Sequence, residues 1–123
     1  MTRQDPASLL PLTPLSLGVL LALAEGPAHG YALLKELDRQ IDGGLTPGTG
    51  TLYAALQRMI DEGLLEEVKR PRGEDARRRY YAVTPWGRRV ARAELRRLAE
   101  LMDAAGAKRL VPELRVAWRR RST

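Results

Sequence analysis

The 123 residues suffice for one compact domain with one or two added helices, and 44% hydrophobic with 29% charged residues is a globular composition. With no cysteine and a single histidine, the sequence excludes disulfides, thiolate or multi-histidine metal sites and cysteine nucleophiles, so we expect no metal and no cofactor. Residues 1–63 contain four Lys and Arg against seven Asp and Glu, whereas residues 64–123 contain 17 against eight. Nearly all these cations are arginine, which favours an anionic polymer as partner over a merely solvated charged surface.

Residues 1–12 contain two prolines and little periodicity, which predicts a flexible N-terminal arm. Thr13-Pro14 then marks a helix start, because threonine caps a first turn and proline is tolerated at its first position. Residues 15–25 are apolar around most of the helix, so this helix must be buried on several sides, by a partner subunit as well as by the domain core. The apolar run is about half of a membrane span and has no secretory signature, which predicts a cytoplasmic protein without a membrane partner.

Two further helices follow, each ended by glycine. The second helix is expected at about residues 29–41, with an apolar stripe at helical spacing. Small residues at 46–50 form a turn that leads into the third helix, which Gly63 ends. Gly48 and Gly50 near its start would let backbone N–H groups approach phosphate, although simple turn geometry also accounts for them.

The spacing of the apolar residues changes after the third helix, from that of a helix to that of a strand. Residues 64–70 and 77–83 predict two strands of a hairpin. Thr84-Pro85 repeats the helix start, and a long helix runs to about residue 105, where Gly106 breaks it. Its apolar residues are spaced by 4, 3, 4 and 3, which is a heptad seam two cycles long. Packing on the same domain is the alternative, but three helices and a hairpin already close a core, so we favour a contact between subunits.

This order of elements is that of a winged helix-turn-helix domain. The predicted fold is mainly α with a small β-hairpin, comprising a DNA-binding domain at 13–83, a dimerisation helix at 84–105 and a basic tail at 106–123 that is partly helical or irregular. The third helix would enter the major groove, roughly 12 Å wide, while the hairpin (the wing) contacts the DNA backbone. The predicted DNA-binding residues of the third helix are Thr49, Gly50, Thr51, Tyr53, Gln57 and Arg58, with a core role as the alternative for Tyr53. Those of the wing are Arg70, Arg72, Arg77, Arg78 and Arg79.

Several short motifs together resemble the PadR family of bacterial transcriptional regulators, in the shorter subfamily with a single long C-terminal helix. The motifs lie in order over about residues 15–105, and the ordered set is specific although each motif alone is weak. They are His29-Gly30-Tyr31, Gly50-Thr51-Leu52-Tyr53, Glu62-Gly63-Leu64-Leu65 and Arg78-Arg79-Tyr80-Tyr81. Arg77 replaces a proline that is usual in the family, and the residues after Gly106 have no counterpart that we can place.

The resemblance implies a homodimer that binds a palindromic operator in double-stranded DNA and acts as a repressor released by a small aromatic effector. It also implies dimerisation through the first and last helices, for which the candidates are Leu15, Val19, Ala91, Leu95, Leu98 and Met102. His29 would organise the turn between helices. Trp86 is a candidate for an effector pocket, with packing between wing and helix as the alternative.

Two other classes of function compare with this reading as follows: one is an alternative, and the other is not expected. A winged-helix module that binds a protein or RNA through its basic face is the alternative to a DNA-binding regulator. An enzyme is not expected, because the sequence has neither a Walker-type glycine motif nor a nucleophile elbow.

Overall fold

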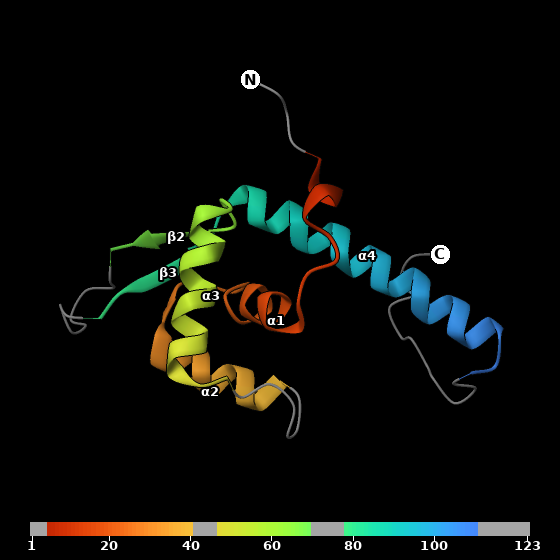
Figure 1. Cartoon of the computed structure of the whole chain (residues 1–123), viewed down its shortest axis with the longest axis horizontal. Helices are drawn as coiled ribbons and strands as arrows, with labels where there is room; N and C mark the ends of the chain where they lie inside the picture. The colour runs from red at the N-terminus through yellow and green to blue at the C-terminus, as the bar shows by residue number, and fades with distance from the viewer. Residues whose placement is uncertain (1–4, 41–46, 70–77, 111–123) are drawn as a thin grey trace.

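The computed structural model describes residues 5–40, 47–69 and 78–110 (Figure 1). It confirms a mainly helical fold with a small antiparallel sheet. The elements are the 3₁₀ helix η1 (Pro6–Leu9), α1 (Pro14–Ala22), β1 (Ala28–His29), α2 (Gly30–Gln40), α3 (Thr49–Asp61), β2 (Leu65–Val68), β3 (Tyr80–Val83) and α4 (Pro85–Ala107). None of the described helices is both long and apolar enough to cross a membrane.

The sheet has three strands rather than the two that were predicted. Its order is β1-β3-β2, and both pairings are antiparallel. β1 consists of two residues, with Ala28 opposite Tyr81 and His29 opposite Tyr80. So short a strand has no periodicity of its own, and only the pairing with a segment some fifty residues later defines it.

The two predicted helix starts are confirmed in detail. The Thr13 hydroxyl accepts a hydrogen bond from the amide of Ser16 at 3.0 Å, and the Thr84 hydroxyl accepts one from the amide of Gly87 at 2.9 Å. The Thr84 hydroxyl also donates to the carbonyl oxygen of Gly63 at 2.6 Å, which joins the start of α4 to the turn after α3. These caps are local interactions, so the sequence alone could predict them.

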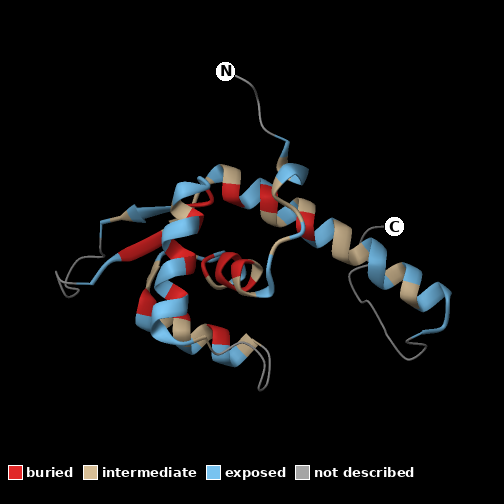
Figure 2. Ribbon diagram, viewed as in Figure 1, coloured by how far each residue is buried: buried red, intermediate tan, exposed pale blue. Residues whose placement is uncertain are grey.

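The core lies among α1, α2, α3, the sheet and the first half of α4 (Figure 2). Gly87 marks the closest approach of α4, because a Cβ there would lie 2.2 Å from the carbonyl oxygen of Leu64. Figures 1 and 2 show the second half of α4 extending away from this body, with exposed and partly buried residues along it. The core side chains are Val19, Leu20, Leu23, Leu33, Leu37, Leu52, Leu56, Met59, Leu64, Leu65, Tyr81 and Val90.

The expected break at Gly106 is not found, because α4 continues through it to Ala107. A glycine inside a helix costs about 1 kcal/mol relative to alanine but does not by itself end the helix. The chain leaves the helix at Lys108, and the next residue, Arg109, adopts a left-handed φ of 58°.

The N-terminal segment also differs from the flexible arm that was expected. Residues 5–12 contain η1, which packs against α4, and three leucines from this segment contact the core cluster. The amide of Leu12 donates to a carboxylate oxygen of Glu94 on α4 at 2.9 Å. Leu9, Leu10 and Leu12 have no helical or strand periodicity, and their burial depends on the apolar surface that the remote helices provide. Residues 1–4 lie outside the described residues.

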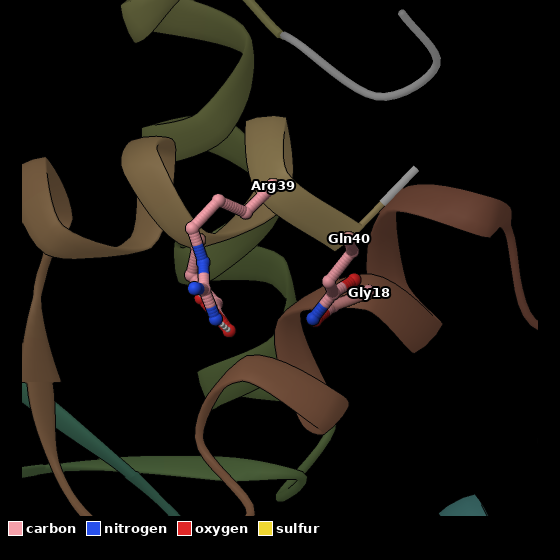
Figure 3. Close-up of polar contacts among 4 residues, drawn as sticks. Gly18, Arg39 and Gln40 are labelled. Atoms are coloured by element: carbon pink, nitrogen blue, oxygen red, sulfur yellow. Dashed lines mark hydrogen bonds and ion pairs between the residues drawn. The ribbon is translucent and has the colours of Figure 1, made fainter. Parts of the chain in front are cut away.

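Side-chain contacts also fix the C-terminal end of α2 (Figure 3). The Gln40 side chain donates to the carbonyl oxygen of Gly18 in α1 at 3.2 Å. Its neighbour Arg39 turns back to pair with Glu36 one turn earlier at 3.1 Å. The contact between Gln40 and Gly18 holds the second helix against the first, and so helps to position the third helix that packs on both.

Candidate nucleic-acid interface

The start of α3 is open to solvent. Thr49, Gly50 and Thr51 are all exposed. The N-cap residue is Gly48, which has no side chain to accept hydrogen bonds from the amides of the first turn. A Cβ at Gly48 or Gly50 would meet no atom within 4 Å. The first amides of a helix have no acceptor within that helix, and they carry a partial positive charge. This end of α3 can therefore receive an anion without displacing any described side chain.

The outer face of α3 contains only part of the predicted set. Tyr53 lies one turn after Thr49 and is 41% exposed, so it is not a core residue. Gln57 continues this face but donates to Asp61 at 3.0 Å. Arg58 differs from the prediction, because its guanidinium donates to the buried Ser16 hydroxyl of α1 at 3.0 Å. We therefore assign Arg58 to the packing of α3 on α1 rather than to base reading.

An open cavity of about 450 Å³ brings three of the predicted motifs together. It is lined by residues from the start of α2, from α3 and from the base of the hairpin. A Cβ at Gly30 would lie 2.2 Å from the Tyr53 hydroxyl, so only glycine leaves room for Tyr53 in this position. The lining residues are His29, Gly30, Tyr31, Tyr53, Arg78 and Arg79.

His29 is held at the wall of this cavity by three contacts. Its Nδ1 accepts a hydrogen bond from the amide of Ala32 at 3.1 Å, which makes His29 the cap of α2. Its ring stands edge-on to the ring of Tyr80, with centroids 5.3 Å apart. Its Nε2 lies 2.7 Å from Nη1 of Arg78. The predicted role of His29 in organising the chain before α2 agrees with the first contact, whereas the third was not predicted.

The wing arginines have different environments. Arg78 and Arg79 lie just before β3 rather than within it. Arg79 is paired with Glu67 of β2, and this hydrogen bond is the main reason why the pKa of Arg79 is raised. Arg78 points to His29 instead. Arg70, Arg72 and Arg77 lie outside the described residues.

The two helix faces predicted for dimerisation are only partly exposed. Val19 is fully buried in the core, so within a single chain it has no surface left for a partner, and its assignment to the interface is corrected. Leu15, Ala91 and Leu98 are half-buried. Leu95 and Met102 on α4 are exposed, as is Leu21 on α1. A shallow cavity of about 150 Å³ between α1 and α4 includes Leu21, Ala91 and Leu95 in its lining.

The family model that matches this sequence is described as the transcriptional regulator PadR-like family, and the match spans residues 19–93. The chain belongs to this family. It is a family of transcriptional regulators rather than of enzymes, in agreement with the resemblance found in the sequence motifs.

The relatives of this PadR-like protein differ in length. It is 40% identical over 83 residues, 68% of its length, to an uncharacterised 37.1 kDa protein in transposon TN4556 of Streptomyces fradiae, of which the match covers 22%. It is 40% identical over 86 residues, 69% of its length, to the transcriptional regulator Rv3488 of Mycobacterium tuberculosis, of which the match covers 76%. The chain thus spans about a fifth of one relative and three quarters of the other.

A solved structure with the same fold is that of Bacillus subtilis PadR in complex with operator DNA. The TM-score is 0.59 at 19% identity, and the match covers 68% of this chain and 47% of that one. At this identity the likeness is one of fold.

Trp86 of the PadR-like protein packs at the junction of the hairpin and α4. It contacts the core cluster, its ring lies near Gly63, and the guanidinium of Arg89 stands 5.5 Å from its ring centroid. It lines neither the cavity at the base of the hairpin nor the shallow one between α1 and α4. These contacts favour the packing role that the sequence left open over an effector pocket at Trp86.

Sequence reasoning also missed Glu94. The residue is 1% exposed, and its carboxylate accepts hydrogen bonds from Leu12 and, at 2.5 and 3.0 Å, from Arg97. The hydrogen bond from Arg97 lowers the pKa of Glu94, the Leu12 amide acts in the same direction, and burial opposes both. The spacing could have indicated its burial, because Glu94 follows Val90 by four residues and so lies on the face of α4 that meets the core.

Proposed function

We propose that this PadR-like protein is a homodimeric, sequence-specific DNA-binding repressor whose α3 enters the major groove. The observation that carries the proposal is the convergence of three features on one side of the molecule. They are the open start of α3, the exposed Tyr53 on its outer face, and the arginine-lined cavity at the base of the hairpin. The fold is shared with Bacillus subtilis PadR, which was solved in complex with operator DNA, and this supports DNA as the partner.

The glycines at the start of α3 support close approach of a nucleic-acid backbone. Neither Gly48 nor Gly50 has a positive φ, and neither is crowded by a neighbour. Neither close packing nor a left-handed backbone therefore requires a glycine at these positions. A phosphate near the positive end of the helix would gain from the absence of a side chain.

Base reading is assigned to the outer face of α3. Thr49, Tyr53 and Gln57 succeed one another at four-residue spacing and so share a face. Gln57 would exchange its contact with Asp61 for a base edge, for which a side-chain amide suits adenine best. The wing, including Arg70, Arg72 and Arg77, is assigned to backbone contacts that set orientation rather than sequence.

The dimer is proposed to form through α1 and α4. Leu21, Leu95 and Leu101 are 45%, 42% and 54% exposed, which leaves large aliphatic side chains in water unless a second copy covers them. To reach two successive major grooves, the two copies of α3 in such a dimer must lie about 34 Å apart, one turn of DNA. Sedimentation of Leu95→Glu is expected to give a monomer where the native chain gives a dimer. A native chain that sediments as a monomer at micromolar concentration would contradict this.

A small aromatic effector is proposed to bind between α1 and α4 rather than at Trp86. A cavity of about 360 Å³ lies there, lined mainly by apolar residues such as Leu17 and Leu21, with Arg97 at its wall. This volume is within the range of small-molecule sites. Titration of 4-hydroxybenzoate into the protein–DNA complex is expected to release DNA, and Leu17→Trp, which fills the cavity, is expected to abolish release without abolishing DNA binding.

The experiment that tests the function is a selection of duplexes from random DNA by the purified full chain, read by sequencing. Two half-sites in inverted repeat, about ten base pairs apart, are expected. Gln57→Ala should change the recovered motif at a cost of about 1–3 kcal/mol on the original site. A selection without any enriched motif, or tighter binding to RNA than to any duplex DNA, would contradict the proposal.

A further inference from the structure

His29 and Arg78 meet at the wall of the cavity at the base of the hairpin, with 2.7 Å between Nε2 and Nη1. They are 49 residues apart in sequence and are brought together by the pairing of β1 with β3. A guanidinium can only donate hydrogen bonds, so this contact is favourable only if Nε2 of the histidine is an acceptor.

The other nitrogen of the same ring makes that role unavailable. Nδ1 accepts a hydrogen bond from the amide of Ala32, so the proton of the neutral ring is on Nε2, and this nitrogen is a donor. The opposite tautomer would set Nδ1–H against the Ala32 amide instead. That amide is fixed in the first turn of α2, whereas Arg78 is an exposed side chain that can rotate. His29 and Arg78 are therefore two donors that converge at the cavity wall.

We propose that His29 and Arg78 form a binding site for one phosphodiester group of the DNA backbone, with the Tyr53 hydroxyl as a third donor. The inference rests on the proposed DNA-binding function and deepens it. Two non-bridging oxygens of one phosphate can accept from both side chains, and its negative charge matches the guanidinium. Arg78 then moves aside from the ring and shares the phosphate with it.

The rest of the cavity supports an external anion. Within the described part of the chain, the nearby carboxylate of Glu67 is engaged by Arg79 and leaves Arg78 without a carboxylate partner. Tyr53 lies directly over Gly30, and the edge-on Tyr80 ring holds the imidazole so that Nε2 remains at the cavity wall. The site adjoins the exposed face of α3, so DNA in contact with that face would bring its backbone past these donors.

The test uses operator duplexes in which one phosphate at a time is replaced by a neutral methylphosphonate. With the native chain, one position in each half-site is expected to weaken binding on the order of tenfold. His29→Asn keeps a side chain that can cap α2 but removes the Nε2 donor. In this variant, and in Arg78→Gln, a methylphosphonate at the sensitive position of the duplex should weaken binding little further. Methylphosphonates at the other positions should have the same effects as with the native chain. Arg78→Gln should also reduce the slope of log K against log salt by about 0.9.

Matched variants separate this site from general charge and from folding. Arg96→Gln removes the same charge from an exposed position on α4, outside the cavity, and should keep the native pattern of sensitive phosphates. Tyr53→Phe should weaken binding less than His29→Asn does. Thermal unfolding should show that His29→Asn is folded.

Three outcomes would overturn the proposal. If His29→Asn is folded and retains the native pattern, His29 only caps α2, although the protein remains a DNA-binding regulator. If inorganic phosphate at millimolar concentration perturbs the His29 ring resonances of the free protein but no methylphosphonate matters, the site binds free phosphate. If the native chain binds no duplex at all, the proposed function fails as well.

Discussion

The base of the hairpin and the contact between the N-terminal segment and α4 each bring an arginine to another polar side chain, but they differ in whether the hydrogen-bonding groups are satisfied within the chain. Where the N-terminal segment meets α4, the buried Glu94 accepts hydrogen bonds from Leu12 and Arg97, so donors and acceptors balance within the chain. At the base of the hairpin, His29 and Arg78 meet at the wall of an open cavity, where we propose that both side chains act as donors. Polar groups that are satisfied internally stabilise the fold, whereas converging unsatisfied donors are available to a ligand.

The glycines of the two regions differ in the same way. Gly87 is crowded by the backbone of Leu64, while Gly48 and Gly50 face open space. The first glycine serves packing, and the other two leave a surface free. Substitutions in the two regions should therefore separate stability from DNA binding, and three predictions test this separation.

The largest effect is expected at Gly87. Alanine would place a Cβ 2.2 Å from the Leu64 carbonyl oxygen, and because that atom belongs to the backbone, α4 must shift. We expect a loss of about 3 kcal/mol in the free energy of unfolding, measured by urea denaturation. Gly106→Ala, at an open position of the same helix, is the matched control and should not destabilise. Equal stabilities of the two variants would refute the close approach.

A smaller effect is expected at Glu94. Glu94→Ala leaves the Leu12 amide and Arg97 without their acceptor and should cost about 2 kcal/mol, with DNA affinity unchanged once the protein is folded. Because folding lowers the pKa of Glu94, its ionised form contributes stability that is fully present above the ordinary glutamate value of about 4.3. This contribution is lost as the pH falls from there through the lower pKa of the folded state.

Glu94→Gln provides the control for that pH dependence. Its free energy of unfolding should vary less between pH 6 and pH 3 than that of the native chain, because glutamine does not titrate. If both proteins lose stability in parallel over this range, Glu94 is not the group responsible.

The smallest effect on stability is expected at Gly50. Alanine meets no atom there and is a better helix former, so the variant should be unchanged or up to about 1 kcal/mol more stable. DNA affinity should fall several-fold, because the methyl group intrudes where the backbone of DNA is proposed to approach. Fluorescence anisotropy with an operator duplex measures this, and a variant that binds as tightly as the native chain would argue against close approach at α3.

Local signals predicted much of the fold. The caps at Thr13 and Thr84, the apolar stripes of α2 and α3, and the change of period at the hairpin were all visible in the sequence. The motifs that resemble the PadR family marked residues that the structure brings together, because His29, Gly30, Tyr31 and Tyr53 line one cavity with Arg78 and Arg79.

The side of a helix on which a given side chain is used was harder to predict. Arg58 and Gln57 are neighbours on α3, yet Arg58 turns inward to Ser16 while Gln57 stays outside. Val19 lies on α1, which is apolar on all sides and was therefore expected to contact a partner subunit as well as the core. In the structure Val19 is buried in the core of its own domain. Because a helix such as α1 is apolar on all sides, its sequence does not indicate which side faces its own domain.

The sequence by itself determined the order, type and starts of the main elements, because caps, glycines and periodicity act over a few residues. Only the tertiary structure decided that β1 pairs with β3, that Leu12 reaches Glu94, and that His29 meets Arg78. These contacts join residues 49 to 82 positions apart. They depend on how preformed elements pack, and no local pattern specifies that geometry.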